Sequence, residues 1–110
     1  MAHIQSELFD QDLIRKANLF KALAHPARLQ ILQFLAKTNH CISGDISDEL
    51  PLGRTTVNQH IKELKKIGLI QGHVEGAKTK YCLNTVCIEE LKEITQEFIA
   101  MFNTQNYKCD

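Results

Sequence analysis

Four polar side chains that can hydrogen-bond to nucleic-acid bases lie within five consecutive positions of this chain. They are Thr55, Thr56, Asn58 and Gln59. The carboxamides of Asn58 and Gln59 can pair bidentately with adenine, and a threonine methyl group can contact thymine. Arg54 and Lys62 flank the set, and their charges suit phosphates, as do the backbone amides at the start of a helix. These residues together predict a surface that contacts DNA.

Such a surface requires one helix face, and the apolar spacing of the same segment provides it. At about 100° per residue, the apolar residues that fall on one side are Val57, Ile61 and Leu64. Thr55, Gln59 and Lys62 fall on the other side. A plain solvated surface, with Thr55 or Thr56 capping the helix, is the alternative. His60 lies at the edge of the apolar side, where a packed histidine and a phosphate contact are both open.

Apolar periodicity and turn residues predict five helices and one β-hairpin. The helices are predicted at residues 9–24, 26–37, 44–50, 54–68 and 87–103. Pro26 suits the first turn of its helix, and Gly68 suits the position that ends the fourth. Residues 51–53, Pro-Leu-Gly, make a tight turn, because proline cannot continue a helix and glycine tolerates a positive φ. The alternating runs 71–75 and 78–83 predict the hairpin.

This order of elements predicts a winged helix-turn-helix, with the helix-turn-helix at residues 44–68 and the wing at 69–83. The fold class is mostly α with a small β-hairpin wing, that is, α+β. In such a fold the second helix of the pair enters a DNA major groove. At 110 residues, positions 1–110 form one domain that is large enough for a single core.

Charge is unevenly distributed, although the chain as a whole is neutral with 13 basic and 13 acidic residues. Residues 54–80 carry six lysines and arginines against two acidic residues, whereas both flanking segments are net acidic. A basic patch confined to the fourth helix and the hairpin is the electrostatic footprint of phosphate contact. In the hairpin, Lys78 and Lys80 alternate outward from the tip and are predicted to contact minor-groove phosphates.

Other function classes find less support in the sequence. No apolar run approaches the roughly 18 residues that cross a bilayer. The N-terminus lacks the basic and apolar blocks of a signal peptide, so no membrane association and a cytoplasmic location are expected. No catalytic triad spacing, paired carboxylates or phosphate-binding glycine loop marks an enzyme. A protein-interaction module is a further alternative, but it would expose an apolar face on the fourth helix, where polar residues lie instead.

Three segments in a consistent order carry a resemblance to a known family. They read LFKALAHPARLQILQFL, RTTVNQHIKELKKIGLI and VEGAKTKYCL. Over residues 12–100 the chain resembles the ArsR/SmtB family of winged-helix repressors, matching its opening helices, its recognition helix and its wing in turn. The resemblance implies a homodimer in which residues 9–24 and 87–103 pair across a two-fold axis. The two recognition helices would then enter successive major grooves of a palindromic operator in double-stranded DNA.

The last predicted helix supports such a dimer independently of the resemblance. Its apolar stripe consists of Leu91, Ile94, Phe98 and Met101. An amphipathic helix of this kind needs a partner that covers its apolar side. That partner can be a second copy of the chain or the first helix of the same chain, and both packings can hold at once.

Members of this family usually release DNA when a metal, a metalloid or a reactive sulfur species binds. The family's third-helix metal motif has two cysteines one residue apart before an aspartate that matches Asp45, and here Cys41 stands alone. Its last-helix motif requires histidines, and residues 88–103 contain none. Neither a resident metal site nor a cofactor is therefore expected.

The chain nevertheless has four cysteines, without a CxxC pair, and disulfide frameworks are rare in the cytosol. They are Cys41, Cys82, Cys87 and Cys109. In winged-helix domains the extended segment before the third helix pairs with the second wing strand. Because strand side chains alternate, Ile42 and Tyr81 should face inward, and Cys41 and Cys82 should share the opposite face.

The cysteine pair could then bind As(III), zinc or another thiophilic ligand, with Cys87 as a third ligand, or form a reversible disulfide. These residues are the candidate thiol sensor. The alternative is two half-buried cysteines that fill space. In that case the chain would be a winged-helix regulator without metal or thiol sensing.

Overall fold

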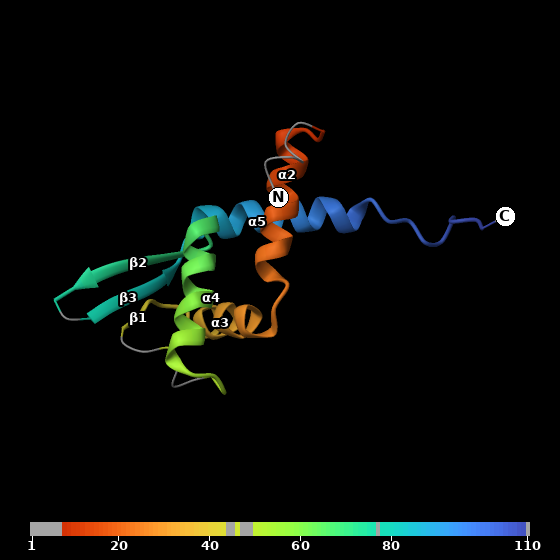
Figure 1. Cartoon of the computed structure of the whole chain (residues 1–110). Coiled ribbons are helices and arrows are strands. Elements are labelled where there is room, and N and C mark those ends of the chain that lie inside the picture. The colour runs from red at the N-terminus through yellow and green to blue at the C-terminus, as the bar shows by residue number, and fades with distance from the viewer. Residues whose placement is uncertain (1–7, 44–45, 47–49, 77, 110) are drawn as a thin grey trace.

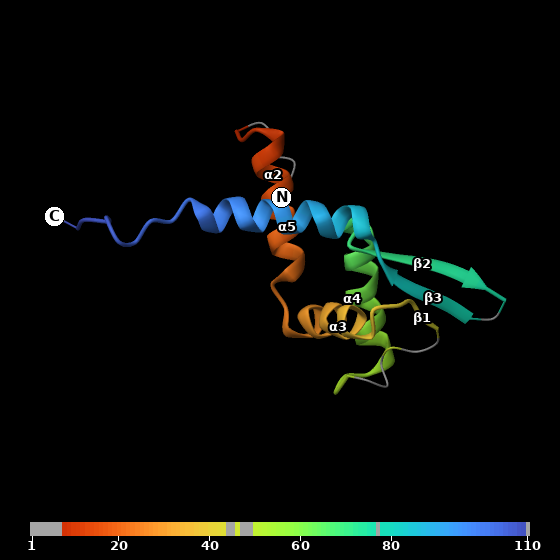
Figure 2. The same ribbon diagram turned by 180° about the vertical axis from the view of Figure 1, so that it is seen from behind.

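The computed structural model describes residues 8–43, 46, 50–76 and 78–109, apart from the side chains at positions 75 and 78. Its elements are α2 (Gln11–Leu23), α3 (Pro26–Thr38), β1 (Ile42–Ser43), α4 (Arg54–Ile67), β2 (Ile70–Glu75), β3 (Lys78–Leu83) and α5 (Thr85–Ala100). Figure 1 shows α4 standing between the sheet and α2, with the C-terminal segment extending away from the body. Figure 2 gives the same arrangement from behind. This is the predicted α+β winged helix-turn-helix.

Local caps set where the first two described helices begin. Asp10 accepts a hydrogen bond from the backbone amide of Leu13 at 2.9 Å, so α2 begins one residue after the aspartate. His25 does the same for α3, because its Nδ1 accepts from the amide of Ala27 at 3.0 Å. Pro26 occupies the first helical position, where no amide donor is needed. Both helices match their predicted ranges to within two residues.

Three antiparallel strands form one sheet in the order β1-β3-β2. The central strand β3 pairs with both others, and Tyr81 on it lies opposite Ile42 on β1. The predicted pairing of the segment before the helix-turn-helix with the second wing strand is therefore confirmed. Ile42, Tyr81 and Leu83 pack against the core, as the alternation of strand side chains predicts.

The core lies where α2, α3, α4 and the sheet meet. Its fully buried side chains are Leu19, Ile31, Leu35, Ile46, Val57, Leu64 and Leu69. Burying each aliphatic side chain of this size contributes about 1.5–3 kcal/mol. Ile46 and Leu50, from the short helix predicted at 44–50, are both buried. The other residues of that helix lie outside the described part of the chain. The described residues include four of the five predicted helices.

The predicted bounds of the last helix, 87–103, are wrong at both ends, since α5 runs from Thr85 to Ala100. It begins earlier because the side chain of Asn84 accepts a backbone hydrogen bond in its first turn, at 3.5 Å. It ends earlier although apolar residues continue. Met101 and Phe102 are 77% and 62% exposed on this chain, so burial does not sustain a further helical turn there.

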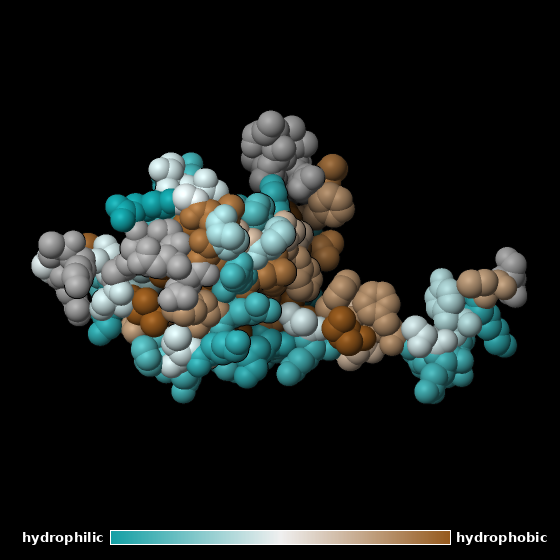
Figure 3. Space-filling model, turned by 90° about the horizontal axis from the view of Figure 1, so that it is seen from below, coloured by the Kyte–Doolittle hydropathy of each residue, from teal (hydrophilic) through white to brown (hydrophobic). Residues whose placement is uncertain are grey.

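Apolar side chains lie exposed at the start of α2 and at the end of α5. They are Leu8, Phe9, Leu13, Phe98, Ile99, Met101 and Phe102. Figure 3 shows hydrophobic atoms along the last turns of α5, next to the extended tail. Closer to the body, Ile94 belongs to the core, and the ring of Phe98 lies 5.5 Å from that of Phe20 on α2. None of the described helices is long and apolar enough to cross a membrane.

Candidate nucleic-acid interface

The helix α4 has one buried and one exposed side. Val57, Ile61 and Leu64 are at most 3% exposed, which confirms the prediction that they face the core. The predicted contact residues that α4 exposes are Arg54, Thr55, Thr56, Asn58, Gln59 and Lys62. The apolar side thus fixes the helix on the body while the polar side faces solvent.

The first turn of α4 has no side-chain cap. Gly53 stands at the N-cap position and has no side chain that could accept a hydrogen bond. The alternative in which Thr55 or Thr56 caps the helix is therefore wrong. Within the described part of the chain, the amides of Thr55 and Thr56, at the positive end of the helix dipole, are left for solvent or for an anion such as a phosphate.

Five exposed polar side chains on α4 have no partner among the described residues. Thr55, Thr56, Asn58, Gln59 and Lys62 make no hydrogen bond or ion pair with the described residues. Arg54 differs, because it interacts with another residue of the chain. Side chains without internal partners can reorient toward base edges and phosphates at little cost. Their assignment as DNA contacts stays a prediction.

The other end of α4 is anchored. Gly68 ends the helix with φ at 101°, the left-handed conformation that the sequence predicts for it. Arg15 of α2 donates from Nη1 to the carbonyl of Ile67 at 3.4 Å. The same guanidinium holds Glu90 of α5 through two hydrogen bonds of 3.0 and 2.8 Å. This hydrogen bonding keeps the pKa of Glu90 below its ordinary value.

His60 lies on the flank of α4, half-buried against α3. Arg28 donates from Nε to its Nδ1 at 3.2 Å, and the ring of His25 lies 4.2 Å away, centroid to centroid. Burial lowers the pKa of His60, and the neighbouring His25 and Arg28 lower it further. Of the two interpretations that the sequence leaves open, this position favours the packed histidine over the phosphate contact.

The wing contributes the remaining predicted contacts. Lys80 lies on the central strand β3 opposite His73 of β2, and it is half-buried. Lys78 begins the same strand, but its side chain lies outside the described residues. Lys65, near the end of α4, reaches the wing. A Cβ added at Gly72 of β2 would lie 3.0 Å from its Nζ. Lys65 of the helix thus lies against the Gly72 and Tyr81 face of the wing.

Cys41 and Cys82 form a disulfide that joins the segment before the helix-turn-helix to the wing strand β3. Their Cα atoms lie 4.4 Å apart, so the two cysteines are neighbours as the strand alternation predicts. The disulfide borders a hollow of about 340 Å³. The hollow is lined further by Leu35, Ala36, Asn39, His40, Leu83 and Thr85. The sensor role of the pair stays a prediction.

Cys87 does not join that pair. It is buried on α5, where its sulfur lies 3.7 Å from Nη2 of Arg15 and 4.0 Å from the carbonyl oxygen of Ile67. Burial raises the pKa of its thiol, which disfavours the thiolate that binds metals. Within the described residues, no three His, Cys, Asp or Glu side chains lie close enough to hold a metal ion. The geometry therefore gives the third-ligand hypothesis no support.

Two contacts of this region are not foreseen from the sequence. One joins Arg15 to Ile67, and the other joins Arg28 to His60, at chain separations of 52 and 32 residues. Local periodicity carries no information about such pairs. The one available signal is a cation at position 28 within a nearly all-apolar helix, because a charge among apolar residues needs a partner.

Comparisons with known proteins agree with this geometry. Residues 25–71 match the model of a family described as bacterial regulatory protein, arsR family. The transcriptional repressor SdpR of Bacillus subtilis is 32% identical over 73 residues, which are 66% of this chain and 80% of SdpR. An uncharacterized HTH-type transcriptional regulator of Methanocaldococcus jannaschii is 31% identical over 83 residues, or 76% and 93%. The structure of HlyU from Vibrio cholerae matches with a TM-score of 0.65 and 26% identity, over 82% of this chain and 97% of HlyU.

Proposed function

The chain belongs to the arsR family of bacterial regulatory proteins, and on this premise we propose that it is a homodimeric repressor released from its operator by thiol chemistry. As a member of that family it is a DNA-binding transcriptional regulator with a winged helix-turn-helix. The observation that carries the proposal is the N-terminal half of α4, which is exposed, polar and uncapped.

In this proposal the two carboxamides of Asn58 and Gln59 and the methyl group of Thr56 contact base edges in the major groove. Lys62, Arg54 and the uncapped first-turn amides of α4 hold the phosphates beside them. Lys80 and Lys78 extend the phosphate contacts along the wing. The phosphate contacts supply affinity and the base contacts supply sequence preference, so the two groups of residues should respond differently to substitution.

Dimer formation is supported by the apolar side chains that α2 and α5 leave exposed, including Leu13, Phe98 and Met101. A second copy that covers them would remove apolar surface from water, which stabilises by about 25 cal/mol for each Å² buried. A two-fold pair presents two copies of α4, and DNA half-sites one helical turn apart would receive them. The protein would act on promoter DNA in the cytoplasm.

A salt titration of binding to a palindromic promoter duplex tests the DNA-binding part. Fluorescence anisotropy should show that the logarithm of the association constant falls linearly with the logarithm of salt concentration, by about 0.9 for each phosphate neutralised. A scrambled duplex of equal length is the control and should bind more weakly. Binding to no promoter duplex, or an affinity indifferent to salt, would contradict the proposal.

Thiol control is supported by the place of the Cys41–Cys82 disulfide. It joins the residue before β1, ahead of the helix-turn-helix, to the wing strand β3, so it restricts how these two segments move relative to each other. We propose that the dithiol form binds the operator. Hydrogen peroxide then oxidises the two thiols to the disulfide in a two-electron step and is itself reduced to water. The oxidised protein releases the operator. Arsenite or zinc bridging the two thiolates would restrain the same elements.

The thiol proposal is tested by comparing operator affinity after treatment with dithiothreitol and after treatment with hydrogen peroxide. The wild-type chain should lose affinity on oxidation, whereas Cys41→Ser should not respond. Cys109→Ser is the matched control, because Cys109 is exposed in the tail and free, and it should respond like the wild type. A Cys41→Ser variant that answers peroxide, As(III) and Zn(II) as the wild type does would end the thiol proposal and leave DNA binding untouched.

A further inference from the structure

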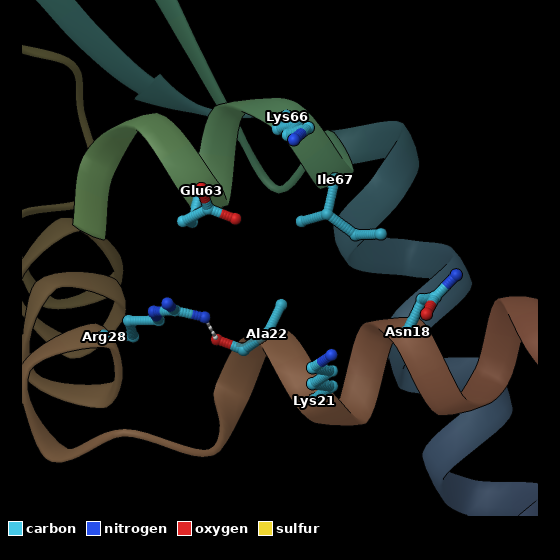
Figure 4. Close-up of a pocket in the computed structure, with 7 residues that line it drawn as sticks. All are labelled: Asn18, Lys21, Ala22, Arg28, Glu63, Lys66 and Ile67. Carbon is cyan, nitrogen blue, oxygen red and sulfur yellow. Dashed lines mark hydrogen bonds between the residues drawn. The ribbon is translucent and has the colours of Figure 1, made fainter. Parts of the chain in front are cut away.

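Arg28 connects the recognition helix α4 to two other helices, α3 and α2. Its own helix is α3, its Nη1 donates to the carbonyl of Ala22 on α2 at 3.4 Å, and its Nε donates to Nδ1 of His60 on α4 at 3.2 Å. Figure 4 shows Arg28 reaching Ala22 across the space beneath α4. No other described contact holds this flank of α4 through a hydrogen bond between side chains.

The donors in this cluster decide where the protons of both imidazoles lie. A guanidinium and a backbone amide only donate hydrogen bonds, so Nδ1 of His60 and Nδ1 of His25 must both accept. Each ring is therefore neutral, with its proton on Nε2. Adding a proton at Nδ1 would remove the acceptor for Arg28 in one ring and the cap of α3 in the other. It would also create cations in rings whose centroids lie 4.2 Å apart.

We propose that Arg28 positions the recognition helix through His60, and that acid releases this hold and weakens operator binding. The proposal rests on the DNA-binding role proposed above. His60 lies one turn after Thr56 and next to Gln59, so a shift of its flank moves the residues assigned to base contact. Charging His60 would set its ring against Arg28, and the recognition helix would lose its hydrogen bond to Arg28 of α3.

The surrounding charges offer the protonated ring no compensation. His25 and Arg28 face it from α3, and both disfavour its charged form. Beside Arg28, a hollow of about 370 Å³ is lined by Lys21 of α2 and by Glu63 and Lys66 of α4 (Figure 4). Glu63 is the carboxylate at this hollow, and Lys21 and Lys66 line the same hollow. Glu63 is therefore not a dedicated partner for a protonated His60.

The direction of the pH effect follows from the neutral state of the ring. A histidine whose folded pKa lies below its unfolded value contributes stability that is complete above about pH 6.5. That contribution is lost as the pH falls through the folded pKa, because the unfolded chain then binds more protons than the folded chain. The hydrogen bond from Arg28 to His60 should therefore be present at pH 7.5 and weakened at pH 5.5.

The variant that separates charge from geometry is His60→Asn. An asparagine oxygen can stand near the position of Nδ1 and accept from Arg28, yet it does not titrate. Operator affinity is measured by anisotropy at pH 7.5 and 5.5 and constant ionic strength. On acidification the wild type should lose about fivefold more affinity than His60→Asn. A factor of about five is at the low end of typical coupling between two linked equilibria. His40→Asn removes an exposed histidine and should follow the wild type. Equal pH dependence in wild type and His60→Asn would overturn the proposal.

Two measurements without DNA keep this test independent of the proposed function. Ring ¹⁵N shifts of the wild-type chain should place the proton of His60 on Nε2 and its titration midpoint below about 6.5. Hydrogen exchange of the α4 amides should accelerate on acidification more in wild type than in His60→Asn, after correction for intrinsic rates. A midpoint at or above 6.5, or equal exchange in both chains, would reject the positioning role. Absence of DNA binding at every pH would reject the proposed function alone.

Discussion

The two ends of the recognition helix α4 are built in opposite ways. At its C-terminal end Gly68 turns the chain, and Arg15 hydrogen-bonds to the carbonyl of Ile67. At its N-terminal end Gly53 provides no cap, and the side chains of Thr55, Thr56, Asn58 and Gln59 make no hydrogen bond with the described residues. The positive end of a helix attracts anions. The fold therefore satisfies the end that faces the body and leaves open the end that DNA would satisfy.

This difference separates the residues that place the helix from the residues that would read DNA. The anchored end takes its partners from α2 and α5, which are also helices with exposed apolar surface. At the open end, Thr55, Thr56, Asn58 and Gln59 have no hydrogen-bond partner among the described residues. Substitutions at the anchored end should therefore change the free energy of unfolding, and substitutions at the open end should change operator affinity.

The largest expected effect is at the open end. Gln59→Ala should weaken specific operator binding by about 1–3 kcal/mol, because a bidentate contact to one base is lost. Non-specific binding and the free energy of unfolding should stay nearly constant, since Gln59 is exposed and makes no hydrogen bond with the described residues. Anisotropy on operator and scrambled duplexes checks both. Gln33→Ala, an exposed glutamine on α3, is the matched control and should leave operator binding unchanged.

The same difference explains how much could be predicted from the sequence. Gly68 as the helix end, the hairpin and the neighbouring Cys41 and Cys82 follow from local signals, namely a glycine at a helix end and the alternation of strand side chains. The hydrogen bonds of Arg15 to Ile67 and of Arg28 to His60 could not be predicted. The bonded residues lie far apart along the chain, and their contact depends on how the helices pack. The end of α5 was missed for a related reason, since its apolar pattern continues where burial stops.

At the anchored end, Gly68→Ala should lower the free energy of unfolding by about 1–2 kcal/mol, the cost of a left-handed conformation for a residue with a Cβ. Space is not the cause, since a Cβ there would meet the sulfur of Cys87 at 3.6 Å, an ordinary contact. Gly68→Asn is the control and should lose less, because asparagine tolerates this conformation better. Urea unfolding measures both. An equal loss in the two variants would show that the positive φ is not what anchors this end.

Arg15→Met should cost less, about 1 kcal/mol, although it removes four hydrogen bonds, one of them to the sulfur of Cys87. Both Arg15 and Glu90 are more than a third exposed, so solvent screens the ion pair. The pKa of Glu90 is lowered in the folded chain, so this stability is present above about pH 4.3 and is lost as the pH falls through the folded value. Urea unfolding at neutral and acidic pH should show a smaller acid loss in the variant. Lys16→Met, which removes the exposed pair with Asp12, should change stability less than Arg15→Met does, because solvent screens an exposed pair.

The smallest effect on stability, and the sharpest test of the comparison, is at Gly53. Its φ of −69° suits any residue, and an added Cβ would meet nothing within 4 Å. Gly53→Asn and Gly53→Asp should each stabilise the fold by a few tenths of a kcal/mol, because both supply the missing cap. Only Gly53→Asp places a negative charge where a phosphate is proposed to bind, so it should weaken DNA binding more than Gly53→Asn does. If both variants bind DNA as the wild type does, the uncapped end is merely an unoptimised helix start and the open end loses its assigned role.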